Sequence, residues 1–149
     1  MIIFLLGISL GVTTHQIYSE YKALEFLKVE VVDAQVRIGA DDVKTIEIAI
    51  TLNFTNPSKV QTQISSDFQI YLSKVYIGDG HLPDVRVAAG ESKLEQVYLH
   101  IDSQQLVLSI ISTLLQGEFE LVIDGVLRTR LLFGLVPISR HFSAVYSYP

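Results

Sequence analysis

The sequence contains no cysteine among its 149 residues. A chain without cysteine forms no disulfide framework, offers no thiolate nucleophile and has no cysteine ligands for zinc. The absence of cysteine also does not distinguish an oxidising from a reducing compartment, so the protein could lie on either side of a membrane.

Charge is sparse, and no excess of basic residues is present. Lys and Arg number 11 against 16 Asp and Glu, the formal net charge is -5, and charged residues make up 18% of the chain. Nucleic-acid binding normally needs a basic stripe that releases phosphate counterions. The sequence has no such stripe, so we expect no nucleic-acid partner.

Long apolar runs are absent except at the amino terminus, where Met1 to Val12 is uncharged and almost wholly apolar. This run is shorter than the roughly 20 residues of a membrane span. It also lacks the preceding basic residue and the small-residue cleavage site of a secretory signal. We therefore predict a single-pass membrane anchor in residues 1–18, of undetermined orientation, with residues 1–25 forming anchor and stalk. The alternative is a short buried helix or strand of the folded domain.

The rest of the chain, residues 26–149, has the size and composition of one globular domain. Hydrophobic residues make up 49% of the sequence, which is typical of a folded protein. A domain of this length can bury a core of useful size. Disorder is therefore not expected.

Alternation between apolar and polar residues is the strongest pattern. Apolar side chains take every second position of one long run, which is typical of a half-buried strand: Ile46, Ile48, Ile50, Leu52 and Phe54. Pro57 cannot donate to a sheet ladder and restricts Asn56 before it. Asn56 and Pro57 are thus predicted to form a turn that ends the strand.

Further alternating runs predict an antiparallel two-sheet sandwich of about seven strands with one helix. A change of phase near Val31 and Val32 indicates either a bulge in the first strand or two short strands. Gly78 and Gly80 are predicted to form a turn that ends a short strand. Gly125, which follows Asp124, is predicted to allow a bend in the chain. The helix is expected from Ser103 to Gln116, with Asp102 and Gln105 forming a capping box. The strands are expected near residues 26–38, 43–54, 64–72, 75–77, 85–87, 93–101, 119–123, 127–131 and 138–146.

The order of these features resembles a known family. The matching segments are Asn53 to Ser58, Tyr76 to Gly80, the predicted helix, and Asp124-Gly125. They resemble the group 2 late embryogenesis abundant proteins, whose module is also called the water stress and hypersensitive response domain. The resemblance is to an archaeal or bacterial-type member with an amino-terminal membrane anchor. The sequence departs from the family at Ser58, where another Asn is common.

The resemblance implies an immunoglobulin or fibronectin III-like sandwich with a role linked to desiccation or other water stress. It implies no catalysis and no cofactor. The predicted function is therefore a noncatalytic, membrane-anchored binding or protective module. The alternatives are a structural subunit of a larger membrane or cell-surface assembly and, with least support, an enzyme. The partner is predicted to be an unknown protein or another copy of the chain.

Residues that could carry chemistry are scattered in the sequence. No two histidines have the local spacing of a metal site, and no coherent set of nucleophile, base and metal ligands is visible, so neither a metal nor a catalytic residue is predicted. His81 is the favoured functional histidine because it is expected on a loop, although a solvated turn residue is the simpler interpretation. Arg128 and Arg130 are predicted to project from one strand face and could join it in a binding surface.

Overall fold

The computed structural model describes residues 18–39, 45–131 and 134–148, which form seven strands and two helices. One helix comprises residues 18–26 and the other is α2 (Gln104–Leu115). The strands are β1 (Lys28–Ile38), β2 (Ile46–Thr55), β3 (Thr62–Leu72), β4 (Val75–Val87), β5 (Ser92–Ile101), β6 (Phe119–Leu131) and β7 (Val136–Tyr148).

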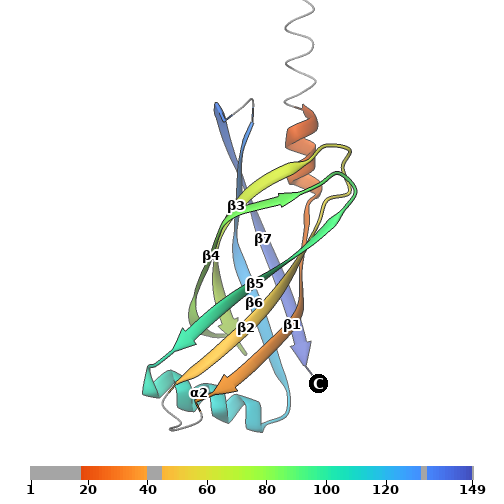
Figure 1. The fold of residues 1–149 in the computed structure, drawn as a ribbon. Coiled ribbons are helices and arrows are strands. Elements are labelled where there is room, and N and C mark those ends of the chain that lie inside the picture. The colour runs from red at the N-terminus through yellow and green to blue at the C-terminus, as the bar shows by residue number, and fades with distance from the viewer. Residues whose placement is uncertain (1–17, 40–44, 132–133, 149) are drawn as a thin grey trace, which may run out of the picture.

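Two antiparallel sheets face each other, one with the order β1-β2-β5 and the other with the order β4-β3-β6-β7. Helix α2 carries the chain from β5 of the first sheet to β6 of the second at one end of the molecule, and helix 18–26 lies at the opposite end (Figure 1). The predicted two-sheet antiparallel architecture is confirmed.

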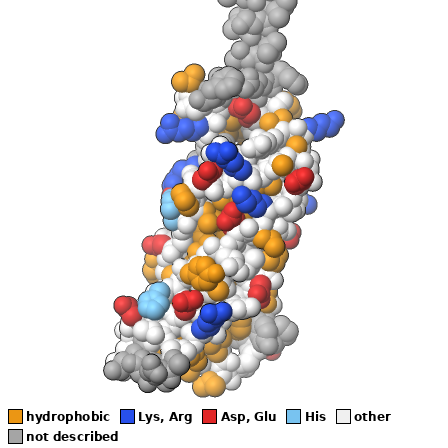
Figure 2. Space-filling view, in the orientation of Figure 1, with side chains coloured by type: hydrophobic (Ala, Val, Ile, Leu, Met, Phe, Trp, Pro, Cys, Tyr) orange, Lys and Arg blue, Asp and Glu red, His pale blue; other side chains and the backbone are white. Residues whose placement is uncertain are grey.

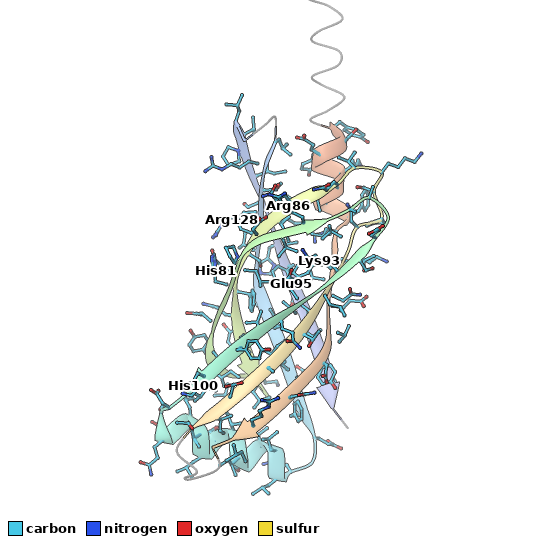
Figure 3. The ribbon with its side chains drawn as sticks, viewed as in Figure 1. His81, Arg86, Lys93, Glu95, His100 and Arg128 are labelled. Carbon is cyan, nitrogen blue, oxygen red and sulfur yellow. The ribbon has the colours of Figure 1, made fainter. Side chains whose placement is uncertain are left out.

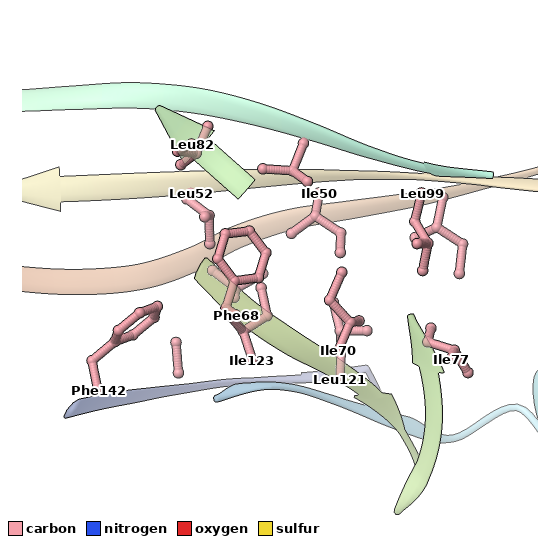
Figure 4. Close-up of a cluster of buried hydrophobic side chains, with 14 of the residues drawn as sticks. Ile50, Leu52, Phe68, Ile70, Ile77, Leu82, Leu99, Leu121, Ile123 and Phe142 are labelled. Carbon is pink, nitrogen blue, oxygen red and sulfur yellow. The ribbon is translucent and has the colours of Figure 1, made fainter. Parts of the chain in front are cut away.

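Strand β2 forms the centre of the three-stranded sheet and follows the predicted alternation. Its inward row, from Ile46 to Phe54, is at most 1% exposed, whereas the residues between are half-buried on the outer side. These side chains meet Phe68, Ile70, Leu121 and Ile123 from the other sheet in one continuous core (Figure 4). The core is therefore built by period-two burial from both sheets.

The predicted bulge in the first strand is confirmed. The pairing of β1 with β2 shifts register between Val31 and Asp33. The connection between β3 and β4 is tight, since Ser73 and Lys74 both have positive φ, at 45° and 72°. Such a pair of left-handed residues forms a turn whose twist matches that of an antiparallel hairpin.

Two glycine-containing segments predicted as turns or bends lie within strands instead. Gly78 and Gly80 are part of β4, which continues to Val87, and Gly125 is part of β6 together with Asp124. The hydrogen-bonded ladders run past the glycines, because Gly80 and Gly125 are the partners of Phe68 on its two neighbouring strands.

Close approach of β3 explains why glycine occupies both positions, through the Phe68 ring at Gly80 and through the β3 backbone and the Phe68 Cβ atom at Gly125. A Cβ atom at Gly80 would lie 2.1 Å from the Phe68 Cε2 atom, and one at Gly125 would lie 2.4 Å from the Asp67 carbonyl oxygen and 2.5 Å from the Phe68 Cβ atom. Phe68 is 3% exposed and packs edge-to-face on Phe142 of β7. Gly80 therefore makes room for the aromatic ring in the core, and Gly125 makes room for the backbone of β3.

The predicted helix is confirmed, but its capping box is wrong. Ser103 is the N-cap, with extended backbone angles, and no side chain donates or accepts a capping hydrogen bond there. Asp102 lies one residue before the cap and so cannot fill the role assigned to it. Val107 and Ile110 are the buried residues of α2.

The prediction of a single-pass membrane protein is corrected by the structure. Within the described ranges, no helix is long and apolar enough to cross a membrane. The predicted anchor falls mainly on residues 1–17, which lie outside the described residues. The segment predicted as a stalk packs on the sandwich, because Ala23 and Leu24 of helix 18–26 and Leu27 after it are at most 2% exposed.

Arg140 of β7 holds the end of helix 18–26 in place. Its guanidinium donates to the carbonyl oxygens of Glu25 and Leu27, each at 2.5 Å. Carbonyl groups at a helix C-terminus lack helical partners and carry partial negative charge, so a cation is favourable there. Burial lowers the pKa of Arg140 from its ordinary value. The first and last described elements are thereby joined.

We predict that Gly80→Ala and Gly125→Ala each destabilise the protein by about 1–3 kcal/mol through overpacking. Phe68→Leu removes the ring atoms that approach Gly80 but keeps the backbone that approaches Gly125. In the Phe68→Leu background, Gly80→Ala should therefore lose most of its cost and Gly125→Ala should keep it. Urea unfolding of the single and double variants measures these energies. Equal relief of both glycine variants would contradict the assignment.

Candidate functional site

Asn56 is a buried residue immediately after β2 whose side chain makes several hydrogen bonds. It is 0% exposed, and its amide nitrogen donates to the carbonyl oxygens of Val60 and Val87 at 2.8 and 3.1 Å. Its side-chain oxygen accepts from the backbone N–H and the hydroxyl of Ser58 at 3.0 and 2.7 Å. Its own backbone N–H donates to Glu91 at 2.9 Å. One side chain thus ties together the turn after β2 and the end of β4.

We predict that Asn56→Ala destabilises the fold by about 2–4 kcal/mol, because it leaves buried backbone groups without partners. Asn53→Ala serves as the control, since Asn53 points to the outer side of the same strand and the substitution should cost less than about 0.5 kcal/mol. Urea unfolding of both variants gives the comparison. Similar midpoints for the two variants would show that Asn56 is not the organising residue.

The outer face of the β4-β3-β6-β7 sheet carries the candidate site. Asp67 of β3 lies between His81 of β4 and Arg128 of β6, and each of its carboxylate oxygens contacts one of these neighbours. The register of β3 with β4 places Asp67 directly opposite His81. His81 and Arg128 lie on the same side of the molecule in Figure 3. The structure therefore brings together two predicted surface residues through an acid that sequence reasoning did not select.

The charges around Asp67 change its acidity. The Arg128 guanidinium, with a smaller contribution from His81, holds the pKa of the Asp67 carboxyl below its ordinary value. Arg128, whose side chain is 52% exposed, and Asp67 both face solvent. Their attraction is therefore screened by water, so it orients the side chains more than it stabilises the fold.

A second histidine-aspartate contact and a hydrogen-bonded tyrosine extend this face. His141 of β7 contacts the carboxylate of Asp124 on β6. Tyr76 donates to Asp79 of β4 at 2.7 Å, and this hydrogen bond raises the pKa of the tyrosine hydroxyl. Asp124 was predicted as a turn residue, but it lies within β6 and so belongs to the same charged face as Asp67 and Arg128.

Among the described residues, Arg128 lines each of three shallow hollows on this face. The central hollow, of about 600 Å³, contains both histidine-aspartate pairs and Asp79. A second, of about 590 Å³, extends toward Glu20, Asp84 and Arg130. The third, of about 360 Å³ and here named the arginine hollow, is lined by Ser65, Arg128, Thr129, Arg130, Pro137, Ile138 and Ser139.

The opposite face of the molecule has a different character. Figure 2 shows the side that includes the β1-β2-β5 sheet, where acidic and basic side chains are interspersed without a large area of one sign. His100 lies on β5 of this sheet, far along the strand from Lys93 and Glu95 (Figure 3). His100 therefore does not join His81 or His141.

Within residues 18–39, 45–131 and 134–148, no three His, Cys, Asp or Glu residues gather where they could hold a metal ion. His15 lies outside the described residues.

Sequence reasoning missed Asp67 and His141 as parts of one surface. Strand alternation could have placed both on outward positions. Their assembly with Arg128 and Asp124 required the pairing of β3 with β6 and of β6 with β7. The contact between Asp67 and Arg128 spans 61 positions in the sequence, which no local pattern encodes.

Comparison with known proteins supports the fold. No protein-family profile matches the chain, and no curated protein matches it. A protein of Arabidopsis thaliana, solved in solution, is similar over 80% of this chain and 78% of its own, with 15% identity and a TM-score of 0.59. That likeness shows a shared fold.

Two further solved structures are more distant. A protein described as a candidate late embryogenesis abundant protein has 12% identity over 97% of this chain and 88% of its own, with a TM-score of 0.48. A protein of Archaeoglobus fulgidus has 13% identity over 82% of this chain and 98% of its own, with a TM-score of 0.46. Neither comparison supports membrane anchoring or a structural subunit of a larger assembly.

We predict that Arg128→Gln raises the pKa of Asp67 toward its ordinary value, because Arg128 is the main cause of the lowering. Arg130→Gln is the matched control, since Arg130 does not contact Asp67, and it should leave that pKa unchanged. Carboxyl NMR titration of the two variants and the wild type measures the effect. The stabilisation from Asp67 is present above its ordinary pKa and is lost as pH falls through the lowered value. Equal shifts in both variants would refute the pairing.

Proposed function

We propose that this protein is a noncatalytic β-sandwich module that binds another protein through the central hollow, in a protective role during desiccation-type stress. The observation that carries the binding proposal is the grouping of two histidine-aspartate pairs and Arg128 on one sheet face. The stress role rests on the order of sequence motifs that resembles the group 2 late embryogenesis abundant proteins. The shared sandwich fold is compatible with that resemblance.

The outer face of the β4-β3-β6-β7 sheet is favoured as the binding surface because its ion pairs contribute little to the stability of the fold. Exposed ion pairs contribute roughly 0–1 kcal/mol to stability, and the core is complete on the other side of the same strands. Polar groups held in fixed positions by sheet register can instead orient a partner. The central hollow supplies both signs of charge for that purpose.

A noncatalytic role is favoured by the surroundings of the histidines. Nucleophilic catalysis needs a hydroxyl or thiol within hydrogen-bond reach of its base. His81 and His141 contact carboxylates, and neither shares a hydrogen bond with a Ser or Thr hydroxyl in the described part of the chain. The arrangement thus suits recognition better than acyl transfer.

We also infer that the sandwich is fibronectin III-like within the broader immunoglobulin group. In immunoglobulin constant-type domains the fourth strand extends the sheet of the first, second and fifth strands. Here β4 pairs with β3 and extends the sheet of β6 and β7. This shift widens the face that carries the central hollow.

The proposal is tested by drying a desiccation-sensitive enzyme, such as lactate dehydrogenase, with the full chain and then measuring recovered activity. The wild type should preserve more activity than an equal mass of albumin. The double variant His81→Ala, His141→Ala should lose most of that advantage, because it removes both imidazoles of the central hollow. Circular dichroism before drying checks that the variant is folded.

His100→Ala is the matched control, because His100 is exposed on the other sheet. It should protect as well as the wild type. Protection no better than that of albumin would overturn the stress role. Equal loss in the control and the double variant would overturn the assignment to the central hollow.

A further inference from the structure

The arginine hollow is positively charged in a protein whose formal charge is -5. Arg128 and Arg130 line it, and none of its lining residues is acidic. The remaining lining groups are three hydroxyl residues, a proline and an isoleucine. Asp67, which pairs with Arg128, is not among the lining residues. The lining itself therefore carries only positive charge, which favours a negatively charged occupant.

Strand register adds hydroxyl groups to the two arginines. Arg128 is directly opposite Ser65 on β3 and directly opposite Ser139 on β7. Neither serine hydroxyl forms a hydrogen bond with another described residue. Ser65 is half-buried and Ser139 is exposed, both on the outer side of their strands. Hydroxyl donors thus flank the guanidinium from both sides.

Both arginines have donors that meet no other described residue. Within residues 18–39, 45–131 and 134–148, the Arg128 guanidinium contacts Asp67 through Nη1. In the same ranges, the Arg130 guanidinium contacts the Gly134 carbonyl oxygen from Nη1 at 3.5 Å. A guanidinium presents five N–H donors in a plane that matches phosphate oxygens. The Asp67 contact also limits the orientations open to Arg128.

We propose that the arginine hollow binds a small tetrahedral oxyanion, a phosphate group that is either free or carried by a small molecule such as a sugar phosphate. Arg128 and Arg130 neutralise its charge, and Ser65 and Ser139 donate hydrogen bonds from the neighbouring strands. The volume of about 360 Å³ suits a small ligand. This inference goes beyond the proposed function, which uses the central hollow and a protein partner.

The test is titration of the full chain with inorganic phosphate, glucose 6-phosphate and glucose at constant ionic strength, followed by amide NMR shifts and calorimetry. Saturable shifts should appear at Ser65, Arg128 to Arg130 and Ser139. Tighter binding of inorganic phosphate would identify a free anion, and tighter binding of glucose 6-phosphate a phosphorylated small molecule. Either result supports the site.

Variants separate a built site from general charge attraction. Arg130→Gln should weaken phosphate binding by about tenfold or more, because it removes a charged donor. Ser139→Ala should weaken it by about fivefold, as expected for one neutral hydrogen bond. Arg86→Gln is the matched control, because Arg86 is an exposed arginine that pairs with Asp84 outside the hollow, and it should leave the affinity unchanged.

Three results would overturn the inference: no saturation with either phosphate compound, equal weakening by Arg86→Gln and Arg130→Gln, or equal binding of glucose. Thermal unfolding of each variant confirms that the fold is intact. The drying assay is independent, because it depends on His81 and His141. If the protein protects the dried enzyme but does not bind phosphate, only the oxyanion site is refuted. If it binds phosphate but does not protect the enzyme, only the stress role is refuted.

Discussion

The packing of Phe68 between two glycines is the constraint on which the four-stranded sheet depends. The ring lies on the inner face of β3, and the strands on either side have glycine at the paired positions, Gly80 and Gly125. Side chains alternate between the two faces of a strand. When Phe68, Gly80 and Gly125 occupy inward positions, the residues adjacent to them in the sequence therefore point outward. Asp67, His81 and Asp124 are therefore brought to the surface by the same contact that completes the core.

Stability and the proposed recognition are divided between the two sides of this sheet. The inner side is apolar and continuous with the inward row of β2. The outer side carries ionic pairs that lie in water and contribute little to folding. Substitutions on the outer side are therefore expected to cost little stability. Arg128 lines both the central hollow and the arginine hollow and couples their charges.

Much of the architecture could be predicted because its signals are local. Alternation identified β2, a phase change identified the bulge in β1, and apolar residues at helical spacing identified α2. Glycine was misleading, because the same residue serves turns and places where a backbone must leave room for a neighbouring side chain. Gly80 and Gly125 are of the second kind, and only the identity of the residue across the ladder distinguishes them. The amino-terminal run was predicted as an anchor from apolarity alone, which the described structure does not support.

The sequence by itself determined which positions are apolar, where Asn56-Pro57 ends a strand, and that no cysteine chemistry is available, because each depends on residue type and near neighbours. The tertiary structure decided which outward residues meet. Asp67, Arg128 and His81 come from three strands, and Asp124 and His141 from two. Pairing across strands depends on register, which is set by the packing of the inner faces over the whole sheet. The candidate site is therefore a consequence of the assembled core.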